Sequence, residues 1–480
     1  MTAPLWTADD LIAGTGGTLG DPAVACPPIL GIEIDSRNCQ AGDLFVALDG
    51  TQNDGHEFIG DAAKAGAAAC LVSRPNKDVP IAQIIVEDPL AGLARLGDAG
   101  RARFTGQMIG ITGSVGKTGS KDMLAHAVAA FGKTHASQRS FNNHIGVPLT
   151  LASLPVDADF AVQEMGMNAP GEIASLTKLA RPDIALITRI ASTHGGFFES
   201  LDDIAKAKAE IFQGLAVGGT AILNLDDPFY PMLGDAARTA GAARIITFGR
   251  NDDAEFCLLE ARQHDRGMSV HAEIAGHELR FEMAMHGIHW AQNALGVLAS
   301  VDALGLCVET AAARLASCPT PKGRGGRQSG LYHGCSITLI DDSYNASPAS
   351  MMAAFASMST TPPTIMILSE MRELGGATAA EHAALMPQIN ALAPRLVIAL
   401  GSAMHGALDL LEDSIAAIAA ADIADAVKSL DDAVEDGDII FIKGSLGSGS
   451  WRVRDAISAS LDPATSSGTP TKNGGNSHAA

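Results

Sequence analysis

A glycine-rich turn between an apolar run and a helix-compatible segment constrains this chain more than any other stretch. The apolar residues 108–111 lead into TGSVGKT, residues 112–118, and a segment compatible with a helix follows over 123–131. Glycines let backbone N–H groups approach phosphate oxygens, and a helix N-terminus favours negative charge. Lys117 can reach terminal phosphates, and the Thr118 hydroxyl can ligate Mg²⁺. Although Ile111 stands where the full Walker pattern has Gly, the stretch predicts a phosphate-binding loop.

Length and charge limit the class of protein. At 480 residues, the chain is long enough for about three domains. Its net charge of −21, from 33 basic and 54 acidic residues, argues against a general nucleic-acid or anionic-membrane binder. The N-terminus has no apolar signal-peptide region, and no apolar run approaches the roughly 18 residues of a membrane span. We therefore expect a cytoplasmic protein without membrane insertion.

The cysteines agree with a cytoplasmic protein, and the hydrophobic composition indicates the kind of interior. The seven cysteines are scattered and form no CxxC motif, which favours reduced thiols over disulfides or a zinc site. Hydrophobic residues make up 47% of the chain and aromatic residues only 4%, which is typical of the small aliphatic interiors of α/β layers.

Alternating strand-like and helix-like segments predict an α/β fold of three domains. We expect a small N-terminal α/β substrate domain, a central P-loop ATPase-like parallel sheet and a C-terminal Rossmann-like domain, at residues 1–104, 105–320 and 321–462. Residues 463–480 have a Ser/Thr/Gly/Asn/Pro composition without periodicity, which is typical of a disordered tail.

Polar residues follow several of the expected strands, where open α/β sheets bind ligands. Glu164 ends the strand FAVQEM and could ligate Mg²⁺ through oxygen, an interpretation we favour over a surface carboxylate. For His194, beyond the next strand, a functional and a merely hydrogen-bonded histidine are equally compatible with the sequence. Ser36 and Arg37 could hold a diphosphate or a sugar, but the residues alone favour a turn with a surface ion pair.

Lys208 is the most informative single residue. Ile204, Lys208, Ile211 and Phe212 fall on one face of a helix, with Ser200 as a plausible N-cap. A buried ammonium is costly unless it is paired or chemically altered. The pattern alone leaves a snorkelling lysine at the core edge equally open.

Two further regions carry candidate nucleotide contacts. Asn293 lies near the start of an expected helix, and Arg324 and Arg327 lie in a Pro/Gly-containing linker over 318–328. The two arginines could reach a phosphate, or could serve only linker solubility. The third unit again places polar residues at strand ends: residues 341–343, Glu370 and residues 443–445.

Taken in order, these motifs resemble a known family. They are TGSVGKT, SFNNHIGVPLTL, EMGMNAPGEI, STH…AKAKAEIF, KGRG, DDSYNASPASM and KGS, preceded by DSR…GDLFVAL…DGHEF…AGAAACLVSR. The chain is similar to the Mur ligases of peptidoglycan synthesis, and most of all to the MurF type. The resemblance covers nearly everything except the tail.

The resemblance implies an ATP-dependent ligation of D-alanyl-D-alanine to UDP-N-acetylmuramoyl-tripeptide. An acyl phosphate would form first, and the products would be the UDP-MurNAc-pentapeptide, ADP and phosphate. It further implies two Mg²⁺ ions, a carbamylated lysine, no nucleic-acid partner and a monomer.

The site residues implied by this resemblance fall into four groups. Lys117, His194 and Lys208 would be catalytic. ATP would be held by Gly113, Ser114, Val115, Gly116, Lys117, Thr118, Gly119, Asn293, Arg324 and Asp342. The UDP-sugar-peptide would be held by Ser36, Arg37, Asn142 and Asn143. Mg²⁺ would be held by Thr118, Glu164, His194 and carbamylated Lys208.

The chain departs from the family pattern in several loops. Gly196 stands where a Glu is expected two residues after His194, and Glu199 could substitute for it. The other departures are Gly119 for Ser or Thr, Ser347 for Asn, Ser369–Glu370 for Gly–Asp and Gly449 for Arg. These changes bear on catalytic rate and ATP affinity rather than on the fold.

Two alternatives to an active MurF-type ligase stay open. One is another ligase of the same architecture, of the MurE or folylpolyglutamate synthase type, although the N-terminal unit argues against the folate type. The other is a degenerate paralogue that binds nucleotide or UDP-muramoyl peptide without turnover. Retention of Lys208 and Glu164, which metal chemistry requires, argues against the paralogue.

Overall fold

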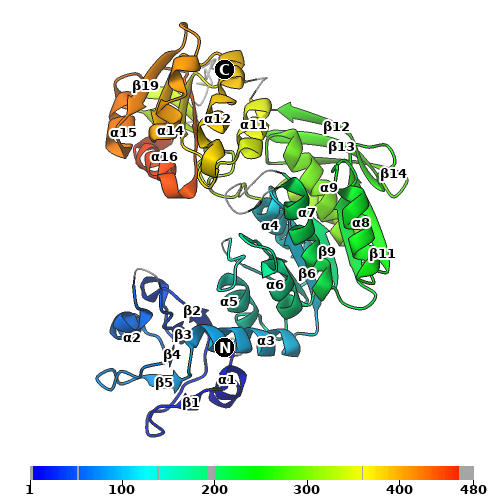
Figure 1. Ribbon diagram of the computed structural model, residues 1–480, viewed down its shortest axis with the longest axis vertical. Coiled ribbons are helices and arrows are strands. Elements are labelled where there is room, and N and C mark those ends of the chain that lie inside the picture. The colour runs from blue at the N-terminus through cyan, green and yellow to red at the C-terminus, as the bar shows by residue number, and fades with distance from the viewer. Residues whose placement is uncertain are drawn as a thin grey trace, which may run out of the picture. The chain divides into compact units, whose positions relative to one another are not determined.

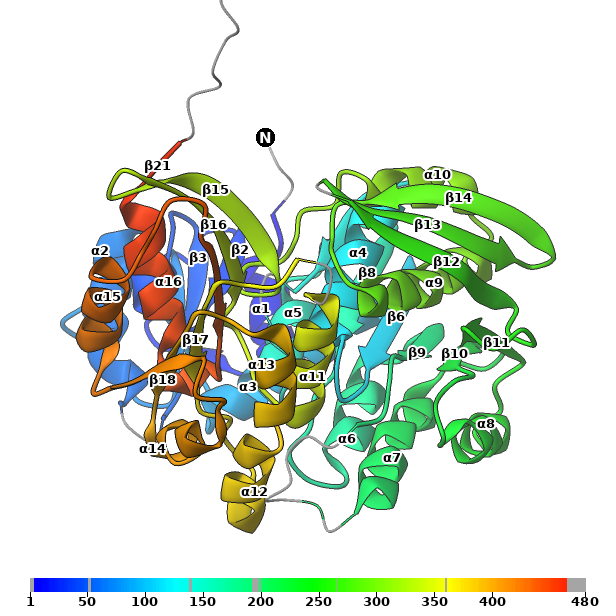
Figure 2. The same cartoon turned by 90° about the horizontal axis from the view of Figure 1, so that it is seen from above.

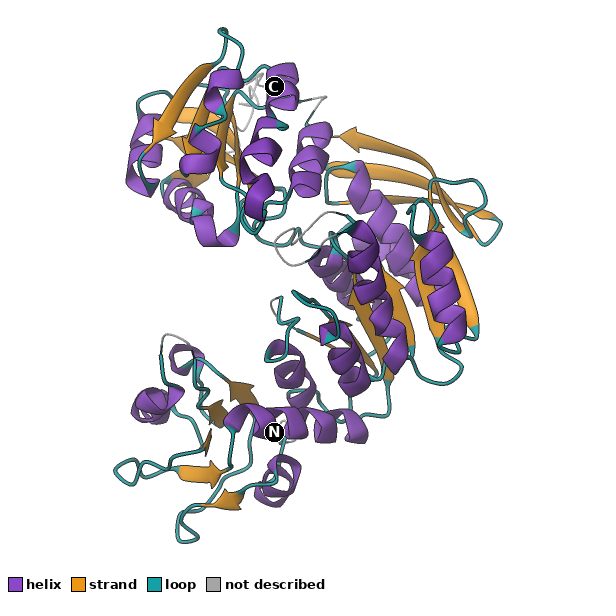
Figure 3. Ribbon diagram, viewed as in Figure 1, coloured by secondary structure: helices purple, strands orange, loops and turns teal. Residues whose placement is uncertain are grey.

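The computed structural model describes residues 4–50, 53–137, 140–191, 198, 200–264, 266–358 and 361–463. The chain divides into two compact units, Met1–Pro321 and Lys322–Ala480. The first unit carries two sheets and the second carries one, and helices cover the sheets (Figures 1 and 3). The predicted three-domain α/β fold class is confirmed, whereas the domain boundaries proposed from the sequence stay predictions.

The N-terminal sheet has the strand order β1-β5-β4-β3-β2. Strands β2 to β5 are parallel, and β1 pairs with β5 in the antiparallel direction. Its elements are α1 (Ala8–Thr15), β1 (Thr18–Leu19), β2 (Gly31–Glu33), β3 (Asp43–Val46), α2 (Ile59–Ala65), β4 (Ala69–Val72), β5 (Ala82–Ile85) and α3 (Pro89–Arg103). Thr7 caps α1 by accepting a hydrogen bond from the Asp10 amide, as the sequence indicates.

The central sheet has nine strands in the order β14-β13-β12-β11-β10-β9-β6-β8-β7. Strands β6 to β12 are parallel, and β13 and β14 add an antiparallel extension. The strands are β6 (Gln107–Thr112), β7 (Thr134–Ala136), β8 (Phe160–Glu164), β9 (Ile184–Ile187), β10 (Thr220–Asn224), β11 (Arg244–Gly249), β12 (Phe256–His264), β13 (Gly267–Ile274) and β14 (His277–Met283).

Two hydrophobic cores lie on opposite faces of the central sheet. One face packs against α4 (Lys117–Val128), α9 (Ile288–Ala303) and α10 (Val308–Leu315), and α10 also contacts the antiparallel strand β14 (Figure 2). The other face packs against α5 (Gly146–Ala152), α6 (Glu172–Ala180), α7 (Leu201–Ala209) and α8 (Tyr230–Thr239). Strand β6 lies between β8 and β9, so the loop after β6 opens beside the ends of both neighbours.

The second unit is a seven-stranded sheet in the order β19-β18-β17-β20-β16-β15-β21. The five strands from β19 to β16 are parallel. The elements are β15 (Gly326–Tyr332), β16 (Cys335–Asp342), α11 (Pro348–Ser357), β17 (Ile365–Ser369), α12 (Thr378–Ala383), α13 (Met386–Leu392), β18 (Leu396–Leu400), α14 (Ser402–His405), β19 (Ala416–Ala420), α15 (Ile423–Asp431), β20 (Ile439–Lys443), α16 (Ser450–Ala459) and β21 (Leu461–Pro463).

Three local expectations in this unit were wrong. The linker expected over 318–328 ends in β15, which begins at Gly326 because residues 326–332 pair with β16. The helical segment expected over 379–390 is two helices, since Pro387 lies in the first turn of α13, where its missing N–H costs nothing. Pro463, expected to begin the tail, belongs to β21, which pairs with β15.

Among the helices of the described residues, none combines the length and the apolar character that a bilayer crossing requires.

Candidate functional site

The loop between β6 and α4 is held in shape by contacts within the first unit. Gly113 (φ +148°) and Gly116 (φ +84°) adopt backbone conformations that side chains disfavour. Lys117 Nζ donates to the carbonyl oxygens of Gly113 (2.7 Å) and Ser114 (3.2 Å). The hydroxyl of Thr188, just beyond β9, donates to the Val115 carbonyl at 2.6 Å. The sequence placed the start of this helix too late, because α4 begins directly at Lys117.

Glu164 lies next to this loop at the end of β8 and is 1% exposed. Its Oε1 accepts a hydrogen bond from Asn142 Nδ2 at 2.7 Å, whereas its buried Oε2 has no hydrogen-bond partner among the residues that the structure describes. The Thr118 hydroxyl lies 3.0 Å from that of Ser140, two residues before Asn142. The segment around Asn142 therefore contacts two of the four side chains proposed as Mg²⁺ ligands, Thr118 and Glu164.

Lys208 is fully buried, as the helical pattern indicates, whereas Lys206 on the same helix is exposed. Ser200 caps α7 by accepting from the Asp203 amide. Within the described part of the chain, the Lys208 Nζ has no hydrogen-bond partner. Burial lowers the pKa of Lys208 far below its usual value, and the positive charge of Lys117 lowers it further; Glu164, Glu210 and Glu172 act in the opposite direction. Lys208 is thus a buried amine within electrostatic range of Lys117 and Glu164.

The chemistry of these groups fits a divalent cation. A carboxylate oxygen that is buried without a partner has given up favourable interactions with water. A bound cation would compensate for that loss. Mg²⁺ prefers oxygen ligands, which Glu164 and Thr118 supply, and Lys208 would supply oxygen once carbamylated. Ser114 Oγ, within the loop itself, is also buried and finds no partner in the described ranges.

Helix α9 brings Asn293 to the same loop. A Cβ placed on Gly116 would lie 2.7 Å from Asn293 Nδ2, so the amide lies directly against the N-cap of α4. The structure therefore brings together the 113–119 loop, Asn142, Glu164, Lys208 and Asn293. His194, Gly196 and Glu199 lie outside the described residues.

The second unit has a polar cluster of its own at the ends of β16 and β20. Lys443 is 2% exposed and donates to Asp342 Oδ2 at 2.6 Å and to the Asn345 carbonyl at 3.0 Å. Burial raises the pKa of Asp342, although the positive charges of Lys443 and Arg324 oppose the shift. The Arg324 guanidinium lies over the Tyr344 ring, 4.5 Å from its centroid. Arg324 and Asp342, which the resemblance assigned to ATP, are therefore neighbours in this unit.

Family models match most of the chain. The Mur ligase family catalytic domain matches residues 28–99, the Mur ligase middle domain matches residues 111–301, and the Mur ligase glutamate ligase domain matches residues 328–446. The UDP-N-acetylmuramoyl-tripeptide–D-alanyl-D-alanine ligase of Bacillus subtilis is 35% identical over 364 residues, which are 75% of this chain and 77% of that protein. The chain belongs to the Mur ligase family.

Solved Mur ligase structures share the architecture. MurF from Acinetobacter baumannii superposes with a TM-score of 0.81 at 28% identity, covering 95% of this chain and 99% of that chain. MurF from Thermotoga maritima, solved in complex with ADP, gives 0.75 at 25% identity, covering 90% and 97%.

Two departures of this Mur ligase from the family pattern fit their surroundings. Ser347 caps α11, and Asn and Ser are both favoured N-cap residues. Gly449 has φ +80°, a conformation that glycine adopts without strain and arginine does not.

The replacement of Gly–Asp by Ser369–Glu370 introduces new side-chain contacts. The Ser369 hydroxyl lies 2.6 Å from that of Ser448. The backbone carbonyl of Glu370 also accepts from Ser445 Oγ at 2.8 Å, a bond that does not depend on which residue stands there. These bonds join the ends of β17 and β20.

The proposed substrate residues make mainly local contacts. Arg37 Nη2 lies 2.6 Å from Asp35 Oδ2, and its side chain is 86% exposed, so the surface ion pair that the residues favoured is present. Ser36 is buried. The Asn143 side chain accepts from the backbone amides of Ile145 and Gly146 and so begins α5. The role of these residues in binding substrate stays a prediction.

Sequence reasoning missed Glu210, which links the Lys208 helix to the loop after β8. Its carboxylate accepts from the amides of Gly171 (2.7 Å) and Ala174 (3.0 Å), at the N-terminus of α6. The partners are 36 to 39 residues away in sequence, and only its position two residues after Lys208 could have drawn attention to it.

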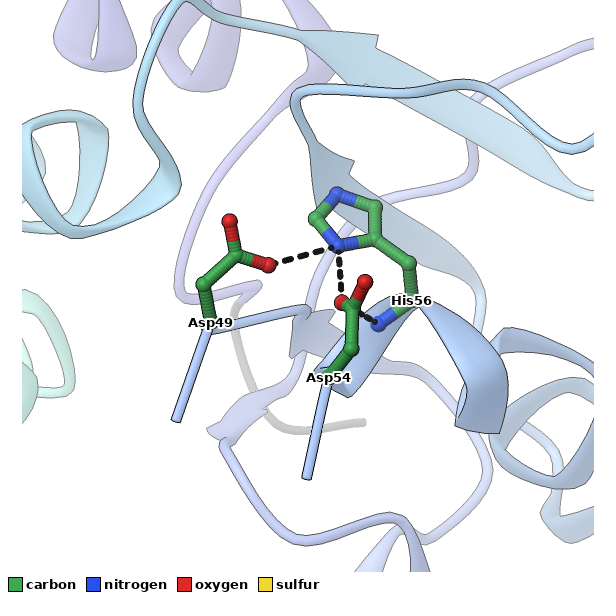
Figure 4. A group of neighbouring side chains, drawn as sticks. All are labelled: Asp49, Asp54 and His56. Carbon is green, nitrogen blue, oxygen red and sulfur yellow. Dashed lines mark hydrogen bonds and ion pairs between the residues drawn. The ribbon is translucent and has the colours of Figure 1, made fainter. Parts of the chain in front are cut away.

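Sequence reasoning also missed a cluster of Asp49, Asp54 and His56 in the N-terminal sheet (Figure 4). His56 Nε2 accepts from the Ser73 amide at 3.0 Å, which leaves the proton of the neutral ring on Nδ1, 2.7 Å from Asp54 Oδ1. Both ring nitrogens are engaged, so the cluster joins the 49–56 segment to the end of β4 rather than offering a nitrogen ligand to a metal.

This cluster makes the stability of the protein sensitive to acid. Hydrogen bonds from the His56 backbone and ring lower the pKa of Asp54 to about 2. Because the folded pKa lies below the usual value, the stabilisation is present above about pH 4 and is lost as pH falls toward 2. We expect Asp54→Asn to lower the Tm at pH 7 and the difference in Tm from wild type to close between pH 4 and pH 2, as followed by calorimetry.

The control is Asp61→Asn, which removes an exposed i,i+3 pair with Lys64 and should change neither the Tm at pH 7 nor its pH dependence. A difference that persists unchanged at low pH would contradict this role.

Proposed function

We propose that this chain is the ligase that joins D-alanyl-D-alanine to UDP-N-acetylmuramoyl-tripeptide, converting ATP to ADP and phosphate. The observation that carries the proposal is the buried amine of Lys208, within electrostatic range of Lys117 and Glu164. Neither this amine nor the buried Oε2 of Glu164 has a hydrogen-bond partner among the described residues. A protein that bound nucleotide without turnover would not need the buried Lys208 amine and Glu164 carboxylate. The similarity to the Bacillus subtilis ligase over most of both chains supports the choice of substrates.

The phosphate groups of ATP would lie on the 113–119 loop. The N-terminus of α4 favours their negative charge, and Lys117 would exchange its bonds to the Gly113 and Ser114 carbonyls for bonds to phosphate oxygens. The Thermotoga maritima MurF structure was solved in complex with ADP, which supports nucleotide binding by a protein of this fold. Asn293, Arg324 and Asp342 would contribute the other nucleotide contacts, and Ser36, Arg37, Asn142 and Asn143 would hold the UDP-sugar-peptide.

Lys208 would act as a carbamate. Its neutral amine attacks CO₂, a C–N bond forms, one C=O electron pair moves to oxygen, and the amine loses one proton to solvent. Burial favours the neutral amine that this step needs, and the product replaces a costly buried cation by a carboxylate-like group.

Thr118, Glu164, His194 and carbamylated Lys208 would hold two Mg²⁺ ions, which neutralise the phosphate charges and the charge that develops during transfer. The tripeptide carboxylate attacks the γ-phosphorus, the bond to ADP breaks, and an acyl phosphate forms. The amine of D-alanyl-D-alanine then attacks the acyl carbon, and phosphate leaves from a tetrahedral intermediate as the amine loses its proton. Lys117 would bind the γ-phosphoryl group during the first step and the leaving phosphate during the second.

The test is product formation with purified protein, Mg²⁺-ATP and UDP-N-acetylmuramoyl-tripeptide, followed by mass spectrometry. With D-alanyl-D-alanine we expect a product heavier by one dipeptide less one water, and no product when any component is omitted. Parallel reactions offer the dipeptide substrate with a diamino acid, or a folate with glutamate. Product in one of these alone would favour another ligase of the same architecture.

A further inference from the structure

Helix α9 approaches helix α4 with two side chains spaced three residues apart, Trp290 and Asn293. They face two glycines that are also three residues apart: Gly119 in the first turn of α4 and Gly116, the N-cap of that helix. Residues three apart lie on one face of a helix, so the two pairs form a single packing surface. Trp290 is 6% exposed and belongs to the hydrophobic core on this face of the central sheet.

The Trp290 ring occupies the space that a side chain at position 119 would fill. A Cβ on Gly119 would lie 2.5 Å from Trp290 Cζ3 and 2.6 Å from Cη2, well inside van der Waals contact. Gly119 lies in the first turn of α4, three residues after the N-cap Gly116. Any larger residue at position 119 would therefore push the ring, and with it α9, away from α4.

The same displacement would reach the phosphate loop. Asn293 lies one helical turn beyond Trp290, with its amide against Gly116. Cores are densely packed and transmit displacements of this kind rather than absorbing them. The separation of the two helices at Trp290 thus sets the position of the Asn293 amide.

We propose that Trp290 and Gly119 are a matched pair that positions Asn293 for nucleotide binding. The proposal rests on the proposed function, because it takes the 113–119 loop as the nucleotide site. It also gives the departure at Gly119 a physical reason: the glycine is required by the tryptophan that packs on it. Trp290 is a positioning residue, since it acts through Asn293.

The first measurement is the sign of a stability change. Replacing a helical glycine by alanine normally stabilises a protein, because the unfolded chain loses conformational freedom. We expect Gly119→Ala to lower the Tm in the wild-type background and to raise it in a Trp290→Leu background. Gly60→Ala, in the first turn of α2, should raise the Tm in both backgrounds, because its Cβ would meet only Val79 Cγ2, at an ordinary contact distance of 3.9 Å. A rise for Gly119→Ala in both backgrounds would overturn the pairing.

The second measurement is the affinity for ADP, by calorimetry at a temperature where all variants are folded. We expect Gly119→Ala to raise the Kd at least ten-fold in the wild-type background and less than two-fold in Asn293→Ala, where there is no amide left to misplace. A merely structural effect would raise the Kd equally in both backgrounds and would overturn the positioning role. Failure of the wild-type protein to bind ADP would refute the nucleotide role together with the proposed function. The signs of the Tm changes would still decide whether Trp290 and Gly119 are paired.

Discussion

Lys208→Met is expected to abolish ligation while making the protein more stable. Methionine has nearly the length of lysine but no amine, so it cannot be carbamylated and cannot hold a cation. Loss of metal-held charge stabilisation costs several kcal/mol in the transition state, or roughly 10³-fold in rate. The folded protein meanwhile no longer buries an amine without a partner.

The stability gain has a definite pH dependence. Because burial lowers the pKa of Lys208, the unfolded chain binds a proton that the folded protein lacks, from the folded pKa up to about 10.5. Wild-type stability therefore rises with pH across this window. At pH values below the window, each unit by which the pKa is lowered reduces the free energy of unfolding by about 1.4 kcal/mol. In metal-free buffer purged of CO₂, we expect Lys208→Met to have a higher Tm than wild type near pH 7. The difference should shrink toward pH 10.

Lys206→Met is the matched control, because Lys206 lies on the same helix with a side chain that is 68% exposed. It should leave activity and the pH dependence of stability unchanged. A ¹³C-bicarbonate signal on the wild-type protein that is absent from Lys208→Met would identify the carbamate. Unchanged activity of Lys208→Met would refute the role of Lys208.

Glu164→Gln is expected to cost roughly 10²–10³-fold in activity without loss of stability. The amide keeps the shape of the side chain and still accepts from Asn142 Nδ2, but it carries no charge for a cation. Because Oε2 has no hydrogen-bond partner in the described structure, removal of the charge breaks no bond. We expect an unchanged or higher Tm and a higher Mg²⁺ requirement for the remaining activity.

Asp438→Asn provides the contrast. Asp438 is also buried, but its carboxylate accepts from Thr364 Oγ1 (2.6 Å), Arg395 Nη2 (2.7 Å) and the Glu435 amide (2.8 Å) at the opposite end of β20 from Lys443. Its substitution should lower the Tm and leave activity nearly unchanged. If Glu164→Gln behaved in this way, with lower stability and full activity, Glu164 would be a structural carboxylate and not a metal ligand.

The sequence predicted the parts of the site that local patterns encode. The glycine and lysine spacing predicted the loop after β6, the four-residue spacing of Ile204 and Lys208 predicted a lysine in the apolar stripe, and strand-end positions predicted Glu164 beside the loop. Each of these depends on residues close in sequence, where helix and strand periodicity fix which side chains share a face.

The parts that were missed depend on residues far apart in sequence. Glu210 caps α6 across 36 to 39 residues, and Trp290 fills space at Gly119 from another helix. Strand β15 forms because β16 pairs with it, although the sequence pattern assigns Gly326 and Arg327 at its start to a linker. Periodicity carries no information on such contacts, so only the folded chain reveals them.

Phosphate release tests the central claim most directly. Wild-type protein is supplied with Mg²⁺-ATP and UDP-N-acetylmuramoyl-tripeptide, with and without D-alanyl-D-alanine, and inorganic phosphate is followed continuously. The account predicts sustained release only when both substrates are present, with one phosphate for each pentapeptide formed. Absence of release from protein that still binds ADP would contradict it and would identify a non-catalytic nucleotide-binding member of the Mur ligase family.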